Sequence, residues 1–173
     1  MQGDVDSAIQ MSSEALEIAT ESGLAVALQP VYTNHGISHY YKGRLPEAEM
    51  HLMDALSYYE KACQGSWGSL AAVYLGFAYG DMKEYEKAEA HHSKSVSISE
   101  STKFLRSWIN VNKLFVLKSK LLGHYSDINF NEISTAIASH ENNRLAVCES
   151  IGTRCIAEIY MHIDDQHMTE AEA

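Results

Sequence analysis

The chain is poor in basic residues and in proline. The first shortage argues against one class of function, and the second permits one kind of fold. Lys and Arg number 13 against 23 Asp and Glu, so the formal net charge is −10 at pH 7. This balance argues against non-specific nucleic-acid binding, which needs clustered Lys and Arg to neutralise phosphates. Only two prolines occur in 173 residues, so long uninterrupted helices are possible.

Cysteine is also scarce, and no long apolar run is present. Cys63, Cys148 and Cys155 form an odd set without framework spacing, which favours a reducing compartment. Cys148 and Cys155 share a helix face, so we interpret them as small packing residues. No apolar run approaches the ~20 residues needed to cross a bilayer, and the polar start MQGDVDSAIQ is not a secretory signal. We expect a cytoplasmic protein that does not bind membranes.

Small residues recur along the chain with a period of 40 residues. Gly36 and Gly76 have this spacing. Further series in the same register are Gly3, Gly43 and Gly123, then Ala8, Ala48 and Ala88, and also Ala15, Ala55, Ser95 and Thr135. Periods of about 20 to 50 residues indicate arrays of stacked supersecondary units.

Within one period the pattern is a helix, a tight turn and a second helix. Tyr32, Gly36 and Tyr40 lie on one helical stripe, Gly43 interrupts it, and Pro46 opens the second helix. Glycine inside a helix costs about 1 kcal/mol relative to alanine. We therefore expect Gly36 where two helices cross closely. The sequence predicts an all-α array of antiparallel helix pairs.

At these positions the chain resembles the tetratricopeptide repeat (TPR). The matching residues are Tyr32, Gly36, Ala48 and Ala55 in one unit, Leu75, Gly76, Tyr79 and Ala88 in the next, and Ile156, Ala157, Tyr160 and Ala171 near the end. The common TPR has about 34 residues. The longer period is similar to that of large bacterial ATPase-type transcription activators of the MalT class and of ATPase-linked nucleotide cyclases. The resemblance implies a right-handed α-solenoid.

Residues 1–173 are expected to form a single TPR-like solenoid segment. A half repeat at 3–23 precedes repeats at about 24–63, 66–101 and 102–142, and a partial repeat covers 143–173, with a turn at 164–167. Both ends fall inside repeats. We therefore expect a segment excised from a longer chain, whose exposed ends permit self-association. In the third repeat Val116 replaces the expected small residue, which indicates a wider helix pair or a shifted register.

The resemblance also implies where a partner binds, because the first helix of each pair lines the concave surface. The groove residues transferred from the family are Thr33, Ile37, Tyr40, Tyr41, Val73, Phe77, Asp81, Lys113, Leu117, Lys120, Arg154 and Glu158. This surface is aromatic and apolar at one end and mixed at the other, where three of its residues are basic. It suits a protein or peptide ligand.

Three functions remain open from the sequence. The first is a protein- or peptide-binding or self-association module of a larger cytosolic signalling or regulatory protein. The second is a sensory domain that binds a small ligand and controls an attached ATPase, transcription-regulator or nucleotide-cyclase domain; the third is a structural spacer. The chain has no Gly-rich phosphate-binding loop and no GxSxG nucleophile elbow. We predict that it is not an enzyme and needs no cofactor.

The nine histidines raise the question of a metal site. His35 and His39 are one helical turn apart, which is a spacing that fits two ligands. A site needs a third and a fourth ligand, and no Cys or carboxylate cluster is placed to supply them. We therefore interpret both residues as semi-buried structural histidines and predict no metal site.

Overall fold

The computed structural model describes residues 4–62, 67–123, 129–142 and 146–171, and this part of the chain is all-helical. Its eight helices are α1 (Val5–Ser22), α2 (Ala25–Tyr41), α3 (Leu45–Ala62), α4 (Trp67–Asp81), α5 (Tyr85–Thr102), α6 (Arg106–Leu122), α7 (Phe130–Asn142) and α8 (Ala146–Ala171). The predicted all-α class is confirmed for the described residues. Cys63 lies outside them.

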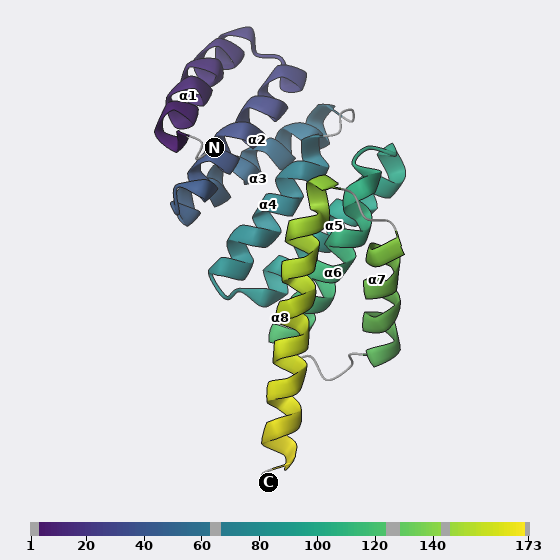
Figure 1. Cartoon of the computed structure of the whole chain (residues 1–173). Helices are drawn as coiled ribbons and strands as arrows, with labels where there is room; N and C mark the ends of the chain where they lie inside the picture. Colours follow the sequence, from purple (N-terminus) through teal and green to yellow (C-terminus); the bar gives the residue numbers. More distant parts are fainter. Residues whose placement is uncertain (1–3, 63–66, 124–128, 143–145, 172–173) are drawn as a thin grey trace.

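From α1 to α7, helices that follow one another in the sequence pack against each other (Figure 1). Helix α2 packs along α3 and α4 packs along α5, and each pair is joined by a short turn. Short connections between packed helices make the members of a pair antiparallel. Contacts between α2 and α4, and between α6 and α8, cross from one pair to the next. One layer of the molecule is thus built from alternate helices.

Glycines lie where paired helices come closest. A Cβ atom on Gly36 would lie 2.6 Å from Leu52 Cγ, and one on Gly76 would lie 2.5 Å from the imidazole of His92. Such distances are far below the contact distance of close-packed carbon atoms. Any larger residue would therefore push the helices apart, which confirms the packing role expected for both glycines.

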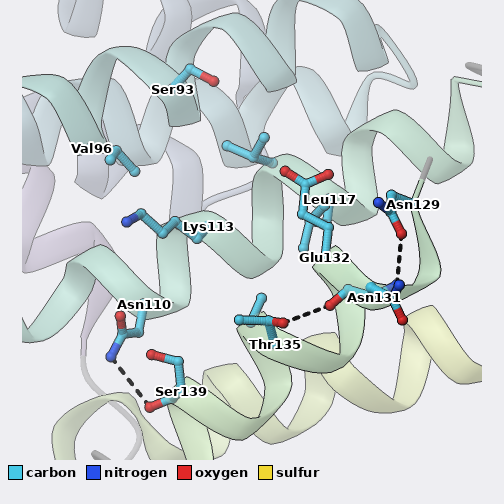
Figure 2. A pocket seen from close by; sticks show the side chains of 12 residues that line it. Ser93, Val96, Asn110, Lys113, Leu117, Asn129, Asn131, Glu132, Thr135 and Ser139 are labelled. Atoms are coloured by element: carbon cyan, nitrogen blue, oxygen red, sulfur yellow. Dashed lines mark hydrogen bonds between the residues drawn. The ribbon is translucent and has the colours of Figure 1, made fainter. Parts of the chain in front are cut away.

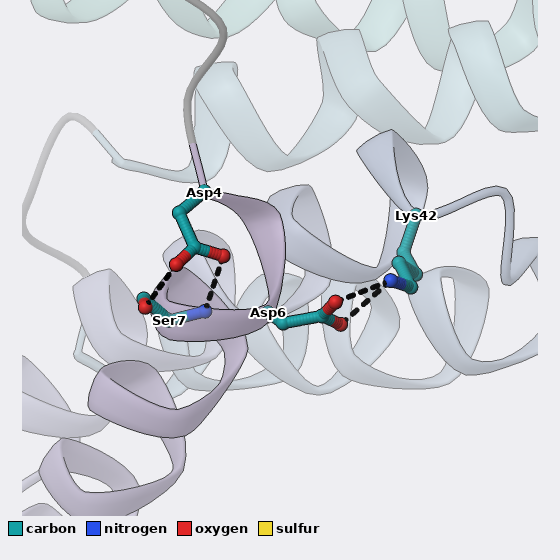
Figure 3. Close-up of polar contacts among 4 residues, drawn as sticks. All are labelled: Asp4, Asp6, Ser7 and Lys42. Carbon is teal, nitrogen blue, oxygen red and sulfur yellow. Dashed lines mark hydrogen bonds and ion pairs between the residues drawn. The ribbon is translucent and has the colours of Figure 1, made fainter.

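The start of α1 is fixed by polar side chains (Figure 3). Asp4 accepts hydrogen bonds from the backbone N and the hydroxyl of Ser7 at 3.1 and 2.6 Å, so it caps the helix. Asp6 pairs with Lys42, at the end of α2, with a closest N–O distance of 2.6 Å. This exposed pair adds little stability, but it joins the first helix to the second.

The turns within the first two pairs have the same backbone geometry. After α2, Gly43 has a φ of 77°, and the next residue donates a hydrogen bond from its backbone N to His39 O. After α4, Lys83 has a φ of 62°, and the following residue donates to Tyr79 O. Glycine takes this left-handed conformation without strain, whereas a lysine does not.

Buried side chains gather in two clusters. The first lies mainly between α3 and α4 and includes Leu52, Leu56 and Leu75. The second joins α6, α7 and α8 and includes Ile133 and Ile159. Cys148 and Cys155 are buried in the second cluster and form no disulfide, as the packing interpretation predicts. Within the described ranges, no helix has both the length and the apolar content needed to cross a membrane.

The third helix pair is more open than the first two. Val116 lines an open cavity of about 850 Å³ that α5, α6 and α7 border. Helix α7 packs less extensively on α6 than α3 does on α2 or α5 on α4. Of the two expectations for this pair, a wider pair or a shifted register, the cavity agrees with the first.

The expected turn at 164–167 is wrong, because α8 continues through these residues to Ala171. The stretch has no glycine or proline to end the helix. Met168, Glu170 and Ala171, which favour helix, come after it. The C-terminal half of α8 consequently projects beyond the neighbouring helices (Figure 1).

Candidate functional site

Side chains from α2, α4, α6 and α8 meet on one face of the molecule, around a cavity of about 80 Å³. Tyr40 comes from the last turn of α2, and Phe77 and Asp81 come from the last two turns of α4. Helix α6 supplies Phe115, and α8 supplies Arg154. Alternate helices contribute these residues, so the site spans several pairs of the array.

Five aromatic side chains form a continuous row at this site, and we call Tyr40, Tyr41, Tyr74, Phe77 and Phe115 the aromatic row. Ring centroids are 5.6 Å apart for Tyr40 and Tyr74, 5.5 Å for Tyr74 and Phe77, and 4.7 Å for Phe77 and Phe115. The interplanar angles of 65° to 76° are those of edge-to-face packing. The row links α2, α4 and α6 and holds its rings in fixed orientations.

Hydrogen bonds fix the phenol groups of the row. The Tyr40 hydroxyl donates to Asp81 Oδ2 at 2.9 Å, and the hydroxyls of Tyr41 and Tyr74 lie 2.9 Å apart. Burial and the neighbouring carboxylate of Asp81 raise the pKa of Tyr40, and burial raises the pKa of Tyr74. Both phenols are therefore neutral at physiological pH, and they present donors and acceptors without charge.

Charged residues border the row on the side of α8. Lys118 Nζ lies 2.7 Å from Glu158 Oε2 and 5.3 Å from the centroid of the Phe115 ring. Arg154 Nε lies 3.5 Å from Glu158 Oε1, and the Arg154 side chain is 70% exposed. Because this second contact is long, the guanidinium keeps donors for a further carboxylate. The border thus has mixed charge, with an accessible arginine.

The structure brings together some of the groove residues predicted from the sequence. Tyr40, Phe77, Asp81 and Arg154 surround the small cavity. Tyr41 adjoins Tyr40 in the aromatic row, with ring centroids 5.5 Å apart. Glu158 contacts Arg154 at the border, and Ile37 is half-buried against the first core cluster.

Other predicted residues do not lie in this groove. Thr33 and Val73 are fully buried, so they pack inside the array and offer no surface to a partner. Lys113 and Leu117 line the larger cavity, and Lys120 is half-buried in the last turn of α6. The period of 40 thus selected a different side of α6 from the one that lines the small cavity.

Sequence reasoning missed Tyr74, Phe115 and Lys118 as members of this site. Phe115 and Lys118 could have been found from the apolar stripe of α6, in which Val111 and Leu114 mark the buried side. Tyr74 follows the buried Val73 and lies on the side of α4 that faces the end of α2. A period of 40 does not bring these two tyrosines to equivalent positions, because Tyr41 and Tyr74 are 33 residues apart.

The larger cavity lies on α5, α6 and α7 (Figure 2). Its lining includes the apolar Val96, Val116 and Leu117 and several polar side chains. Lys113 lies 3.4 Å from Glu100 on α5. Volumes of about 300 to 1,000 Å³ are typical of small-molecule pockets, so a cavity of about 850 Å³ has the size of a metabolite site.

The third feature is a histidine cluster. His51 on α3 approaches His35 and His39 on α2, and one ring nitrogen of each lies within 4.8 Å of the others. The sequence prediction considered only Cys and carboxylates as further ligands, and His51 is a candidate third ligand that it did not consider. We also compared the chain with known proteins. No protein-family model matches it, and the search of curated proteins found no match.

Proposed function

We propose that the chain is a TPR-like, right-handed solenoid segment that binds a protein or peptide segment on the face of the aromatic row. Two repeated features support the solenoid: the close crossings at Gly36 and Gly76, and the equivalent turns at Gly43 and Lys83. Alternate helices line one face in such arrays, and α2, α4, α6 and α8 supply most of the lining of the small cavity, to which α5 adds Tyr85 and His92. The setting we propose is a larger cytosolic signalling or regulatory protein.

The aromatic row is the observation that carries this proposal. Interfaces depend on a few aromatic and arginine anchors in preformed pockets. Here rigid rings border a small cavity, Tyr41 is 61% exposed, and Arg154 stands beside them. These features suit a peptide with one apolar side chain for the cavity and one acidic side chain for the arginine. The site has no arrangement of nucleophile and base, so we propose no enzymatic activity.

Selection from a peptide library against the intact chain tests this proposal. We expect the selected peptides to carry an apolar residue close to an acidic one. Tyr41→Ala and Arg154→Gln should each weaken their binding by about tenfold, which is the usual effect of losing one interface anchor. Met53→Ala, at an exposed position on α3, is the matched control and should bind normally. Peptides that bind all four proteins equally would refute the assignment of the site.

A second candidate function is a small-ligand sensor, and the cavity of about 850 Å³ favours it. A metabolite seated between α6 and α7 would draw the third pair together and so transmit a signal along the array. Saturating ligand should raise the melting temperature of the chain by mass action. Ala136→Leu would fill part of the cavity and should abolish that shift. A ligand that stabilises this variant and the natural chain equally would bind elsewhere.

A further inference from the structure

Three histidines from α2 and α3 form a cluster that the proposed function does not use. His35 and His39 are 6% and 7% exposed, and His51 is half-buried. Their ring centroids are 4.3 to 5.3 Å apart. His35 Nε2 and His39 Nε2 are separated by 3.3 Å. The rings therefore turn their nitrogens toward a common point rather than stacking face to face.

The close helix crossing at Gly36 brings these rings together. His35 directly precedes this glycine, and His39 follows one turn later on the same helix. His51 directly precedes Leu52, whose side chain packs over Gly36. Since the glycine lets α3 approach α2 closely, His51 can reach the pair of rings on α2. The cluster thus depends on two helices and not on one sequence motif.

A hydrogen bond from α1 orients His35. Ser12 Oγ lies 2.7 Å from His35 Nδ1 and 3.0 Å from the backbone carbonyl of Ile9. When the hydroxyl donates to Ile9, its oxygen accepts from His35 Nδ1, and this tautomer leaves a lone pair on Nε2. Metal-binding histidines are usually held in this way, with the second ring nitrogen donating to an oxygen.

The other two rings make few hydrogen bonds. Nε2 of His39 contacts only His35 Nε2, in a hydrogen bond of 3.3 Å that a metal ion between the two atoms would replace, and the Nδ1 atoms of His39 and His51 are buried without a hydrogen-bond partner. Burial lowers the pKa of His35 to about 4, with a further contribution from its two histidine neighbours. Burial also lowers the pKa of His39 and of His51. All three imidazoles are consequently neutral at physiological pH, which is the form that binds metals.

The distances fit a tetrahedral metal ion. Zinc binds imidazole nitrogen at about 2.0–2.1 Å, so two ligands at the tetrahedral angle lie about 3.3–3.4 Å apart. The Nε2 atoms of His35 and His39 already have this separation, at 3.3 Å. His51 needs a shift of roughly 1.5 Å to reach the same spacing, from the longest separation in the cluster. A half-buried side chain can make such a shift by changing its rotamer.

We propose that His35, His39 and His51 bind a divalent transition-metal ion, with Zn²⁺ as the physiological occupant. Imidazole nitrogens suit zinc, copper and nickel, whereas magnesium and calcium take oxygen ligands. Three protein ligands leave the fourth position of a tetrahedral ion to water. The half-exposed His51 provides the route of entry. Bound metal joins α2 to α3 and, through Ser12, holds α1 against them.

Zinc titration of the full chain tests this proposal. The protein is first treated with a chelator, and ZnCl₂ is then added while heat and melting temperature are recorded. We expect one equivalent to bind and the melting temperature to rise with free zinc. His51→Gln should weaken binding by about tenfold to a hundredfold. His91→Gln is the matched control, because His91 is the residue 40 positions later in the repeat, and it should bind zinc normally.

Cobalt gives a second readout that needs no variant. Co²⁺ in a tetrahedral nitrogen site absorbs visible light strongly, whereas octahedral Co²⁺ absorbs weakly. The natural chain should show the strong bands after one equivalent, and added zinc should remove them. Zinc binding no tighter than millimolar, equal affinity of the His51→Gln variant, or bound cobalt without the strong bands would each overturn the site.

Discussion

His92 predicts a measurable loss of stability in acid. Its side chain is 2% exposed on α5, and its ring stacks on Phe115 with centroids 5.1 Å apart. Burial is the main reason that the pKa of this imidazole falls to about 3: the Asn112 side chain opposes the shift, and the positive charge of Lys118 on α6 and the neighbouring His91 add to it. The folded protein therefore holds His92 neutral at a pH where an exposed histidine is charged.

The sign and size of the effect follow from these two pKa values. In the unfolded chain the pKa of histidine is about 6.5. Above this value the ring is neutral in both states, and His92 adds no pH dependence. Below it only the unfolded state takes up the proton, so the free energy of unfolding falls by about 1.4 kcal/mol per pH unit until the pH reaches the folded pKa of about 3. At about pH 5 the loss is roughly 2 kcal/mol.

The variant His92→Leu isolates this contribution. Leucine already fills the equivalent position in the first pair, where Leu52 packs over Gly36 as His92 packs over Gly76. Urea unfolding of both proteins at neutral pH and at about pH 5 gives the two free energies. The variant should lose about 2 kcal/mol less than the natural chain over this interval. The other histidines cancel, since both proteins contain them. Equal losses would refute the idea that His92 stays neutral when folded.

Two substitutions and one labelling experiment test other parts of the fold. Lys83→Gly should stabilise the protein by about 1 kcal/mol in urea unfolding, because it relieves a left-handed lysine at the place that Gly43 occupies in the first pair; a loss would show that the lysine is not strained. Gly36→Ala should lower the free energy of unfolding by about 1 to 3 kcal/mol in the same assay, because the new methyl group overlaps Leu52. An unchanged free energy would mean that α3 can move aside. Burial raises the pKa of the Cys155 thiol to about 12, so a thiol reagent should modify it only after denaturation; fast labelling of the native protein, located by peptide mapping, would contradict its burial.

The sequence predicted features that depend on local pattern. The period of 40 located the helix pairs, and Gly36 and Gly76 marked their closest crossings correctly. The acidic residues just before the first helical stripe indicated a capped start at Asp4 or Asp6, and in the structure the cap is Asp4. Such signals are visible in one chain because the residues that interact are few positions apart or repeat regularly.

Features set by packing between helices were harder to predict. The period selected Lys113 and Leu117 for the groove, but both line the larger cavity between α6 and its neighbours α5 and α7. The histidine cluster was missed because its third member lies on the opposing helix. His51 precedes Leu52, which packs over Gly36. To place His51 near His35 and His39, one must know how closely α3 approaches α2 at this glycine, and a periodic pattern does not give that distance.

The division of the core into two clusters has a consequence for cooperative unfolding. Phe77 and Trp108 pack against both clusters, and both side chains are only partly buried. The two clusters therefore meet where α5 and α4 pack against α6, and this seam is the place at which the array can divide on unfolding. In linear helical arrays stability is a sum of local terms and nearest-neighbour terms. Amide protons of α6, α7 and α8 should accordingly exchange with solvent as one unit, before those of α3 and α4 open.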